Sequence, residues 1–182
     1  MRIRDIHIHA VVVPRVYNTR VAAAGGHIGG KDDSRYYLLE FETDTGLIGL
    51  GEISDIEDAW AAPAPAALRE TLAAPLLDAD PLKRRPTWER IETALPSDYH
   101  PEFRNLVTSA VDVALLDLAG KHHHAPAHAL LGDEIQEKAS DLVGPGLLSG
   151  DVVAPRLEYQ QGGLGLGVDL VPTLLAQYGA EI

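Results

Sequence analysis

One stretch of this sequence decides the fold, and it reads Ser109-Ala110-Val111-Asp112-Val113-Ala114-Leu115-Leu116-Asp117-Leu118-Ala119-Gly120-Lys121. Apolar residues in it and just before it recur at spacings of three and four, which places them on one side of an α-helix. Gly120 is expected to end this helix, and Lys121 places a cation near its negative C-terminal end. The apolar stripe consists of Phe103, Leu106, Val107, Ala110, Val111, Ala114, Leu115 and Leu118.

Strand patterns precede this helix. Residues Ile6 to Val13 are rich in β-branched residues and predict a strand that ends at Pro14. Two further strands, Tyr36 to Thr43 and Leu47 to Ile53, flank an Asp44-Thr45-Gly46 turn and predict a hairpin. The glycine-rich residues Tyr17 to Ser34 are expected to form a long loop, and loops of this length are usually functional or mobile.

Alanine, leucine and charged residues dominate after Asp55. They predict helices over Ala66 to Leu77 and from Pro81 or Leu82 to Leu95, with one or two more helical turns over Pro126 to Leu131. In the glycine-punctuated tail we expect a strand over Val152 to Gln160, extended chain over Leu164 to Leu170, and a last short helix over Pro172 to Tyr178.

Composition narrows the class of protein. The chain has 182 residues, 46% of them hydrophobic, which suits one globular domain or two. The net charge of −12 argues against nucleic acid or an anionic membrane as partner, because phosphate groups are bound by clustered cations. No cysteine is present, and neither a signal peptide nor a membrane-spanning stretch is visible. These features predict a cytoplasmic protein.

Three motifs in the right order resemble the enolase superfamily, in the branch of mandelate racemase and muconate lactonizing enzyme. The stretch 109–121 resembles the family's "A-x-D-x-A-L-x-D-L-x-G-K" helix, and residues 45–52, Thr-Gly-Leu-Ile-Gly-Leu-Gly-Glu, resemble its "T-x-x-G-x-x-G-x-G-E" hairpin. Gly120-Lys121, Pro126 and Leu130-Leu131-Gly132 are similar to its "G-K-x-x-x-x-P-x-x-x-L-L-G" segment. The tail from Gly150 to Leu170 resembles the family's final strands and "P-G-L-G-V-x-L-D" motif.

The resemblance implies an α+β fold: a three-stranded antiparallel β-meander packed on a helical bundle and completed by C-terminal strand and helix pieces. Residues 1–135 would form the main part of an N-terminal capping domain. Residues 136–149 would be a junction in place of the catalytic barrel, and residues 150–182 a segment that packs back on the cap. A (β/α)₈ barrel needs about 200 residues or more, so this chain is expected to contain no TIM barrel.

Activity is also implied by the resemblance. Family members abstract the proton α to a carboxylate while Mg²⁺ stabilises the resulting enediolate. They are isomerases or lyases such as racemases, cycloisomerases or acid-sugar dehydratases. Its metal ligands and catalytic bases lie on the barrel, so the resemblance assigns this chain no catalytic residue, no metal ligand and no cofactor of its own. The glycine-rich loop and the segment after the hairpin would form the lid over a small carboxylic acid. Candidate lid residues are Tyr17, Arg20, His27, Lys31, Glu52, Ser54 and Asp55.

Other clusters of polar residues in the sequence are compatible with other kinds of site. Asp5-Ile6-His7-Ile8-His9 is similar to the D-x-H-x-H metal motif of amidohydrolases, and alternation places its polar residues on one strand face. A polar strand face without metal is the alternative. His122-His123-His124 with His128 is a second candidate for zinc or nickel, or simply a polar helix end. Asp112 and Asp117 lie about 140° apart on a helix, so they are expected to anchor neighbouring elements rather than to act as an acid/base pair.

Three functions follow from these features. The first is an inert capping domain, whose former barrel-facing surface would favour self-association into a homo-oligomer. The second is a stand-alone module that binds a small acid or a protein. The third is a metal-dependent hydrolase that uses His7 and His9.

Overall fold

The computed structural model describes residues 1–14, 20–22, 28–30, 33–131 and 163–180. Three long strands form one antiparallel sheet in the order β1-β4-β5, from β1 (Ile3–Pro14), β4 (Asp33–Thr43) and β5 (Ile48–Ile53). The predicted hairpin is confirmed, because β4 and β5 pair through a tight turn in which the Gly46 N–H donates to the Thr43 carbonyl at 3.0 Å. Gly46 has a φ of 78°, the left-handed conformation that glycine adopts without strain.

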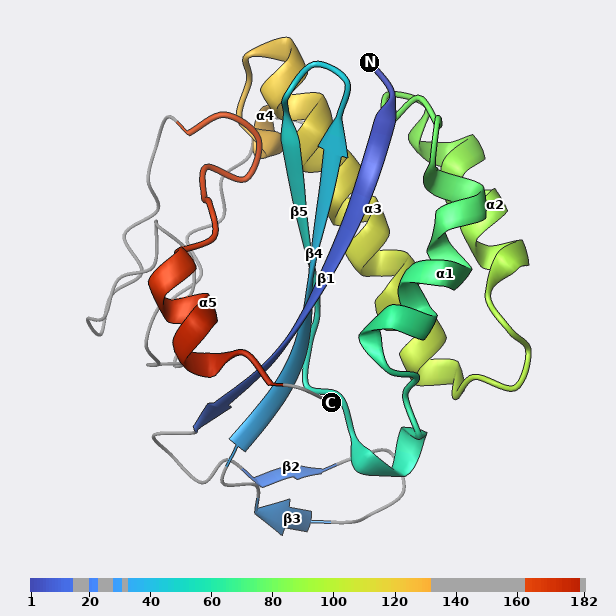
Figure 1. The fold of residues 1–182 in the computed structure, drawn as a ribbon, viewed down its shortest axis with the longest axis vertical. Coiled ribbons are helices and arrows are strands. Elements are labelled where there is room, and N and C mark those ends of the chain that lie inside the picture. Colours follow the sequence, from blue (N-terminus) through green and yellow to red (C-terminus); the bar gives the residue numbers. More distant parts are fainter. Residues whose placement is uncertain (15–19, 23–27, 31–32, 132–162, 181–182) are drawn as a thin grey trace.

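Three helices cover one face of this sheet (Figure 1). They are α1 (Pro65–Leu76), α2 (Arg84–Ala94) and α3 (Pro101–His123), and a short turn of 3₁₀ helix, η1 (Asp58–Trp60), precedes them. Two shorter helices complete the described chain, namely α4 (Ala127–Leu131) and α5 (Pro172–Tyr178). The α+β meander on a helical bundle, predicted from the resemblance, is therefore confirmed.

The hydrophobic core lies between the sheet and these helices. From β1 and β4 it takes alternate residues such as Ile6, Leu39 and Phe41, and from the helices Leu72 and Phe103, all fully buried or nearly so. Every residue of the predicted stripe on α3 contributes to this core or packs against it. The amphipathic pattern in the sequence therefore identified the buried side of the longest helix.

Two glycines let α3 lie unusually close to β5. A Cβ atom at Gly51 would lie 2.1 Å from the Ala110 carbonyl oxygen, and one at Gly49 would lie 2.5 Å from that of Ala114. No side chain fits between backbones at this distance, because real Cβ contacts essentially never fall below 3.0 Å. The G-x-G of the hairpin motif is thus a packing requirement.

The prediction that α3 ends at Gly120 was wrong. The helix continues to His123, and His124 closes it in the left-handed conformation with a φ of 52°. Gly120 is buried inside the helix, where a Cβ atom would lie 2.6 Å from the Gly165 Cα. Glycine is needed at position 120 because the C-terminal segment packs closely there, and not because the helix ends there.

The predicted loop Tyr17 to Ser34 contains regular structure, which corrects a second expectation. Strands β2 (Arg20–Ala22) and β3 (Ile28–Gly30) pair antiparallel as a separate two-stranded sheet, and β4 begins at Asp33. The short β-runs are interrupted by glycine and small residues, so no alternating pattern marks them in the sequence. Figure 1 shows this small sheet at one end of the molecule, beyond the ends of β1 and β4.

The C-terminal segment folds back on the domain at two places. Gly165 forms a bridge with Pro126 beside α4, and Gly179 forms one with Val11 of β1. The predicted helix at Pro172 to Tyr178 is confirmed as α5. The chain expected to be extended over Leu164 to Leu170 instead turns at Gly165 to Gly167 and is irregular up to Leu170. The predicted junction 136–149 and the strand Val152 to Gln160 lie outside the described residues. None of the helices that the structure describes combines the length and the hydrophobicity of a membrane span.

Candidate functional site

The candidate lid lies where the small sheet and the chain after β5 share one end of the molecule (Figure 1). Arg20 opens β2 and pairs with Gly30 of β3. The other lid candidates of this loop, Tyr17, His27 and Lys31, fall outside the described residues.

The segment after β5 turns sharply away from the sheet. Glu52 lies on β5 opposite Leu38, and Ser54 and Asp55 follow as half-buried residues. Asp55 adopts a φ of 51°, which is uncommon for a residue other than glycine but tolerated by aspartate. The Ile56 N–H then donates to the Arg35 carbonyl at 2.9 Å and fixes the segment against β4. Glu52 thus lies near the end of β5, and Ser54 and Asp55 lie in the turn that follows it. Their role as lid residues stays a prediction.

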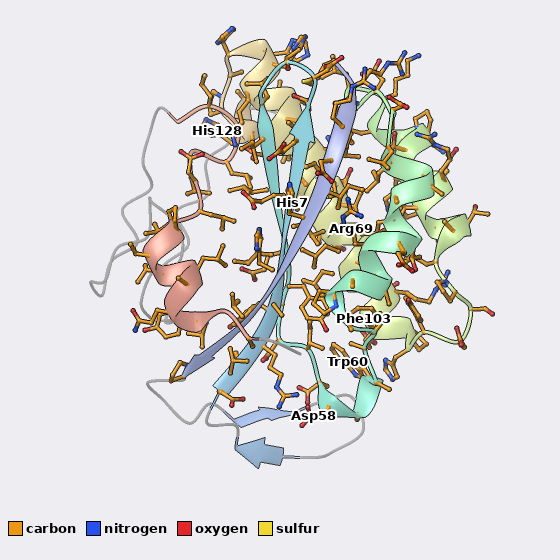
Figure 2. All side chains as sticks on the ribbon, in the orientation of Figure 1. His7, Asp58, Trp60, Arg69, Phe103 and His128 are labelled. Carbon is orange, nitrogen blue, oxygen red and sulfur yellow. The ribbon has the colours of Figure 1, made fainter. Side chains whose placement is uncertain are left out.

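A pair of stacked rings, which sequence reasoning missed, joins η1 to the start of α3. The Trp60 ring stacks on the His100 ring with 5.5 Å between centroids and 14° between planes. Figure 2 shows Trp60 and Asp58 at the end of the molecule that carries β2 and β3. Asp58 forms an ion pair with Arg35. Because Trp60 and His100 are forty residues apart in sequence, no local spacing could reveal their contact.

Tyr37 ties the same region to the core. Its hydroxyl donates to the Pro63 carbonyl at 2.9 Å. Burial raises the pKa of Tyr37 above its usual value of 10.0, although the neighbouring Arg35 opposes this change. The hydroxyl is therefore a neutral hydrogen-bond donor at ordinary pH, and its role is structural.

His100 also begins α3, so its removal has a measurable cost. Its Nδ1 accepts the Glu102 N–H at 3.3 Å and caps the helix. We expect His100→Ala to lower the free energy of unfolding by about 1–2 kcal/mol, through loss of the cap and of the Trp60 stack. Urea denaturation would measure it. His100→Asn is the matched control, because asparagine caps well without stacking, and equal losses in both variants would contradict a contribution from the cap.

The predicted polar face of β1 is confirmed on the side of the sheet away from α1 and α3. His9 Nε2 forms a hydrogen bond with Glu40, and His7 Nε2 lies 3.5 Å from Glu42 Oε1 and 3.7 Å from Asp5 Oδ2. The two imidazole rings stack with 6.4 Å between centroids. The cluster thus joins β1 to β4 through side chains of opposite charge when the histidines are protonated.

Hydrogen bonds shift the ionisation of two carboxylates in this cluster. The bond with His9 lowers the pKa of Glu40 below its usual 4.5, and burial works in the opposite direction. Hydrogen bonds from the Arg69 guanidinium and the Ile6 N–H likewise hold the pKa of Asp5 below 3.8. Both carboxylates are therefore stabilised in their charged form by the folded state.

A pH dependence follows for Glu40. A carboxylate with a lowered pKa in the folded state contributes stability above its unfolded pKa and loses it as the pH falls through the folded value. We expect the free energy of unfolding to decrease as the pH falls below about 4.5, and to decrease less steeply in Glu40→Gln. Urea denaturation between pH 3 and 7 would measure both slopes. His9→Ala should flatten the slope similarly, and an unchanged slope in Glu40→Gln would contradict this assignment.

The candidate metal clusters do not converge in the described structure. Among the residues described, no three His, Asp or Glu side chains are placed to hold one metal ion. His122 and His123 lie in the last turn of α3, with 5.0 Å between their ring centroids. His124 is the C-cap of that helix, and His128 lies on α4. We therefore assign no metal-dependent step to these histidines or to His7 and His9.

Asp117 is a carboxylate of α3 that is fully buried. Its Oδ2 accepts the Leu50 N–H of β5 at 2.9 Å and the Lys121 ammonium at 2.8 Å. Its Oδ1 accepts the Leu166 N–H of the C-terminal segment at 2.7 Å. Asp112, by contrast, pairs with Arg84 of α2. The prediction that both aspartates anchor neighbouring elements is confirmed.

Comparisons with known proteins agree with this fold. The model of the mandelate racemase/muconate lactonizing enzyme N-terminal domain matches residues 8–132. A family member from Roseovarius nubinhibens ISM, solved with magnesium, is 27% identical with a TM-score of 0.60, and the match covers 75% of this chain and 35% of that one.

Two more distant structures share the fold. The N-succinyl Arg/Lys racemase of Bacillus cereus ATCC 14579 is 24% identical with a TM-score of 0.57. The muconate lactonizing enzyme of Pseudomonas fluorescens, solved with muconolactone, is 21% identical with a TM-score of 0.58. Both matches cover 75% of this chain and 35% of the other, so the matched part is about a third of each relative. On the family match and the fold together, this chain belongs to the mandelate racemase/muconate lactonizing enzyme family of the enolase superfamily and carries its N-terminal domain.

Proposed function

We propose that this chain is a capping domain of the family that has no catalytic barrel between its two parts. The observation that carries the proposal is the return of residues 163–180 onto α3 and β1. Only residues 132–162, 31 positions, separate this segment from α4. A (β/α)₈ barrel needs about 200 residues or more, so it does not fit into this interval.

The chemistry of the family is then not performed by this chain alone. In the family, bases on the barrel abstract the proton α to a carboxylate and Mg²⁺ stabilises the resulting enediolate. The residues assigned above stabilise the cap, and we propose none of them as an acid, base or metal ligand. The lid candidates Tyr17, Arg20, His27, Lys31, Glu52, Ser54 and Asp55 would face a small carboxylic acid, with Arg20 or Lys31 suited to its carboxylate.

Deuterium exchange tests the proposed lack of activity. The purified chain is incubated in D₂O with Mg²⁺ and either N-succinyl-arginine or muconolactone, and incorporation at the carbon α to the carboxylate is followed by NMR. We expect no exchange above the buffer rate, whereas the Bacillus cereus racemase is the positive control for N-succinyl-arginine. Exchange above the buffer rate would overturn the proposal.

Thermal unfolding and light scattering test self-sufficiency. We expect one cooperative transition that Mg²⁺ and Zn²⁺ leave unchanged, because no three His, Asp or Glu side chains of the described residues are grouped to hold an ion. We also propose that the surface that faces a barrel in the family pairs two copies here. The scattering mass should then exceed 19.6 kDa and rise with concentration, and a constant monomer mass would contradict this part.

A further inference from the structure

The C-terminal end of α3 has the geometry of a receptor for a backbone turn. Three groups from residues 117–127 bind the turn: the Ala125 carbonyl accepts the Gly165 N–H at 3.0 Å, the Ala127 N–H donates to the Gly165 carbonyl at 2.6 Å, and Asp117 Oδ1 accepts the Leu166 N–H at 2.7 Å. Gly120 forms the floor beneath Gly165. Four contacts at one point thus recognise backbone rather than side chains.

This receptor is held in place without help from the turn. The other oxygen of Asp117 is fixed by the Leu50 N–H and by Lys121, and Lys121 also donates to the Ile48 carbonyl at 2.7 Å. Asp117 is therefore held in place by contacts that do not involve the turn. Preorganised groups of this kind lose little entropy on binding.

The turn must carry glycine at one position. Gly165 has a φ of 64°, and a Cβ atom there would lie 2.1 Å from Asp117 Oδ1 and 2.6 Å from the Asp117 carbonyl oxygen. The side chains on either side are less constrained, because Leu164 and Leu166 are 40% and 38% exposed. Recognition is thus strict at Gly165 and permissive beside it.

A second, weaker anchor lies downstream. The Ala180 N–H donates to the Ala10 carbonyl of β1 at 2.9 Å, but α5 between the two anchors buries none of its residues. Few contacts therefore hold the segment apart from the two anchors. Residues 132–162 could span roughly 100 Å when fully extended, which is long enough to reach another molecule.

We propose that the site formed by Asp117, Gly120, Ala125 and Ala127 is a preformed receptor for a glycine turn, and that it binds this turn from a second copy of the chain as well as from its own. The proposal concerns docking of residues 163–180 only and does not depend on the proposed function. Tethered segments compete at effective concentrations that reach about 1 mM, so the chain's own segment normally occupies the site. Exchange between copies becomes visible when that segment is disabled.

A labelled peptide of residues 163–180 tests this on the full-length chain. In Gly165→Val the chain's own turn cannot dock, while the receptor is unchanged. Fluorescence anisotropy should show saturable binding of the wild-type peptide to Gly165→Val, at least about tenfold tighter than to the wild-type chain. Circular dichroism would establish that the variant is folded. If Gly165→Val does not fold, the Leu166→Pro variant takes its place in the experiment, because proline lacks the N–H that Leu166 donates to Asp117.

Peptide variants give the matched controls. A peptide with Gly165→Val should not bind, and one with Leu164→Ala should bind like the wild-type peptide. Absence of saturable binding to the folded Gly165→Val chain would overturn the proposal. Equal binding of the Gly165→Val peptide would also overturn it, because the interaction would then be general adhesion rather than recognition of the turn.

Discussion

Replacing Asp117 by alanine is expected to lower the free energy of unfolding by about 3–5 kcal/mol, the typical cost of removing one partner from a buried ion pair. The loss has two sources. The Leu50 and Leu166 N–H groups would lose their acceptor, and Lys121, of which only 14% is exposed, would lose its counter-charge. Urea denaturation at neutral pH would measure the change.

Asp112→Ala is the matched control on the same helix. Its carboxylate is 39% exposed and pairs with one side chain, Arg84, so the expected cost is only about 0.2–1 kcal/mol. Asp117→Asn should fall between the two, because an amide keeps the volume but can accept through one oxygen only. If Asp117→Ala costs no more than Asp112→Ala, the three contacts of Asp117 do not contribute to stability as described.

Gly51→Ala is expected to cost about 3 kcal/mol, the upper part of the usual range for overpacking. The added methyl group would meet the Ala110 carbonyl oxygen at 2.1 Å and the carbonyl carbon at 3.0 Å. Both belong to the backbone of α3, so no rotamer change relieves the contact. Either α3 moves away from β5 and opens the core, or the domain does not fold.

The Gly46→Ala variant separates the cost of backbone strain from the cost of a steric clash. A Cβ atom at Gly46 would meet nothing within 4 Å apart from the adjacent residues, but the φ of 78° is left-handed. The expected cost is about 1–2 kcal/mol, from backbone strain alone. Thermal and urea denaturation of both variants would compare the two costs. A larger loss for Gly46→Ala than for Gly51→Ala would contradict the close approach of α3 and β5.

The sequence predicts the main elements because their signals are local. The apolar stripe on α3 repeats with the helical period, and the β4–β5 hairpin has an Asp-x-Gly turn between two β-rich runs. The error at Gly120 has a clear cause, because glycine ends helices but also permits close packing. Its partner, Gly165, is 45 residues away, so the second role could not be recognised from the sequence.

Long-range contacts define what the sequence could not predict at the candidate site. The partners of Asp117 come from β5, α3 and the C-terminal segment, and the Trp60–His100 stack joins η1 to the start of α3. Glu52, Ser54 and Asp55, by contrast, were named through the family resemblance; Glu52 lies on β5 and the other two follow it, and their lid role stays a prediction. The contacts of Asp117 and the Trp60–His100 stack form only in the folded chain, so the sequence alone did not reveal them.

The contacts of Asp117 and Lys121 also govern how this sheet meets other molecules. An outer strand exposes unpaired N–H and C=O groups that can add a strand from another chain and start aggregation. On β5, the Leu50 N–H donates a hydrogen bond to Asp117, and the Ile48 carbonyl accepts one from Lys121. On β1, the Ile6 carbonyl accepts a hydrogen bond from Arg69, and the Ala10 carbonyl accepts one from the Ala180 N–H. Both edges of the sheet are therefore partly closed to strand addition, and side chains that hold the domain together also protect it from cross-β association.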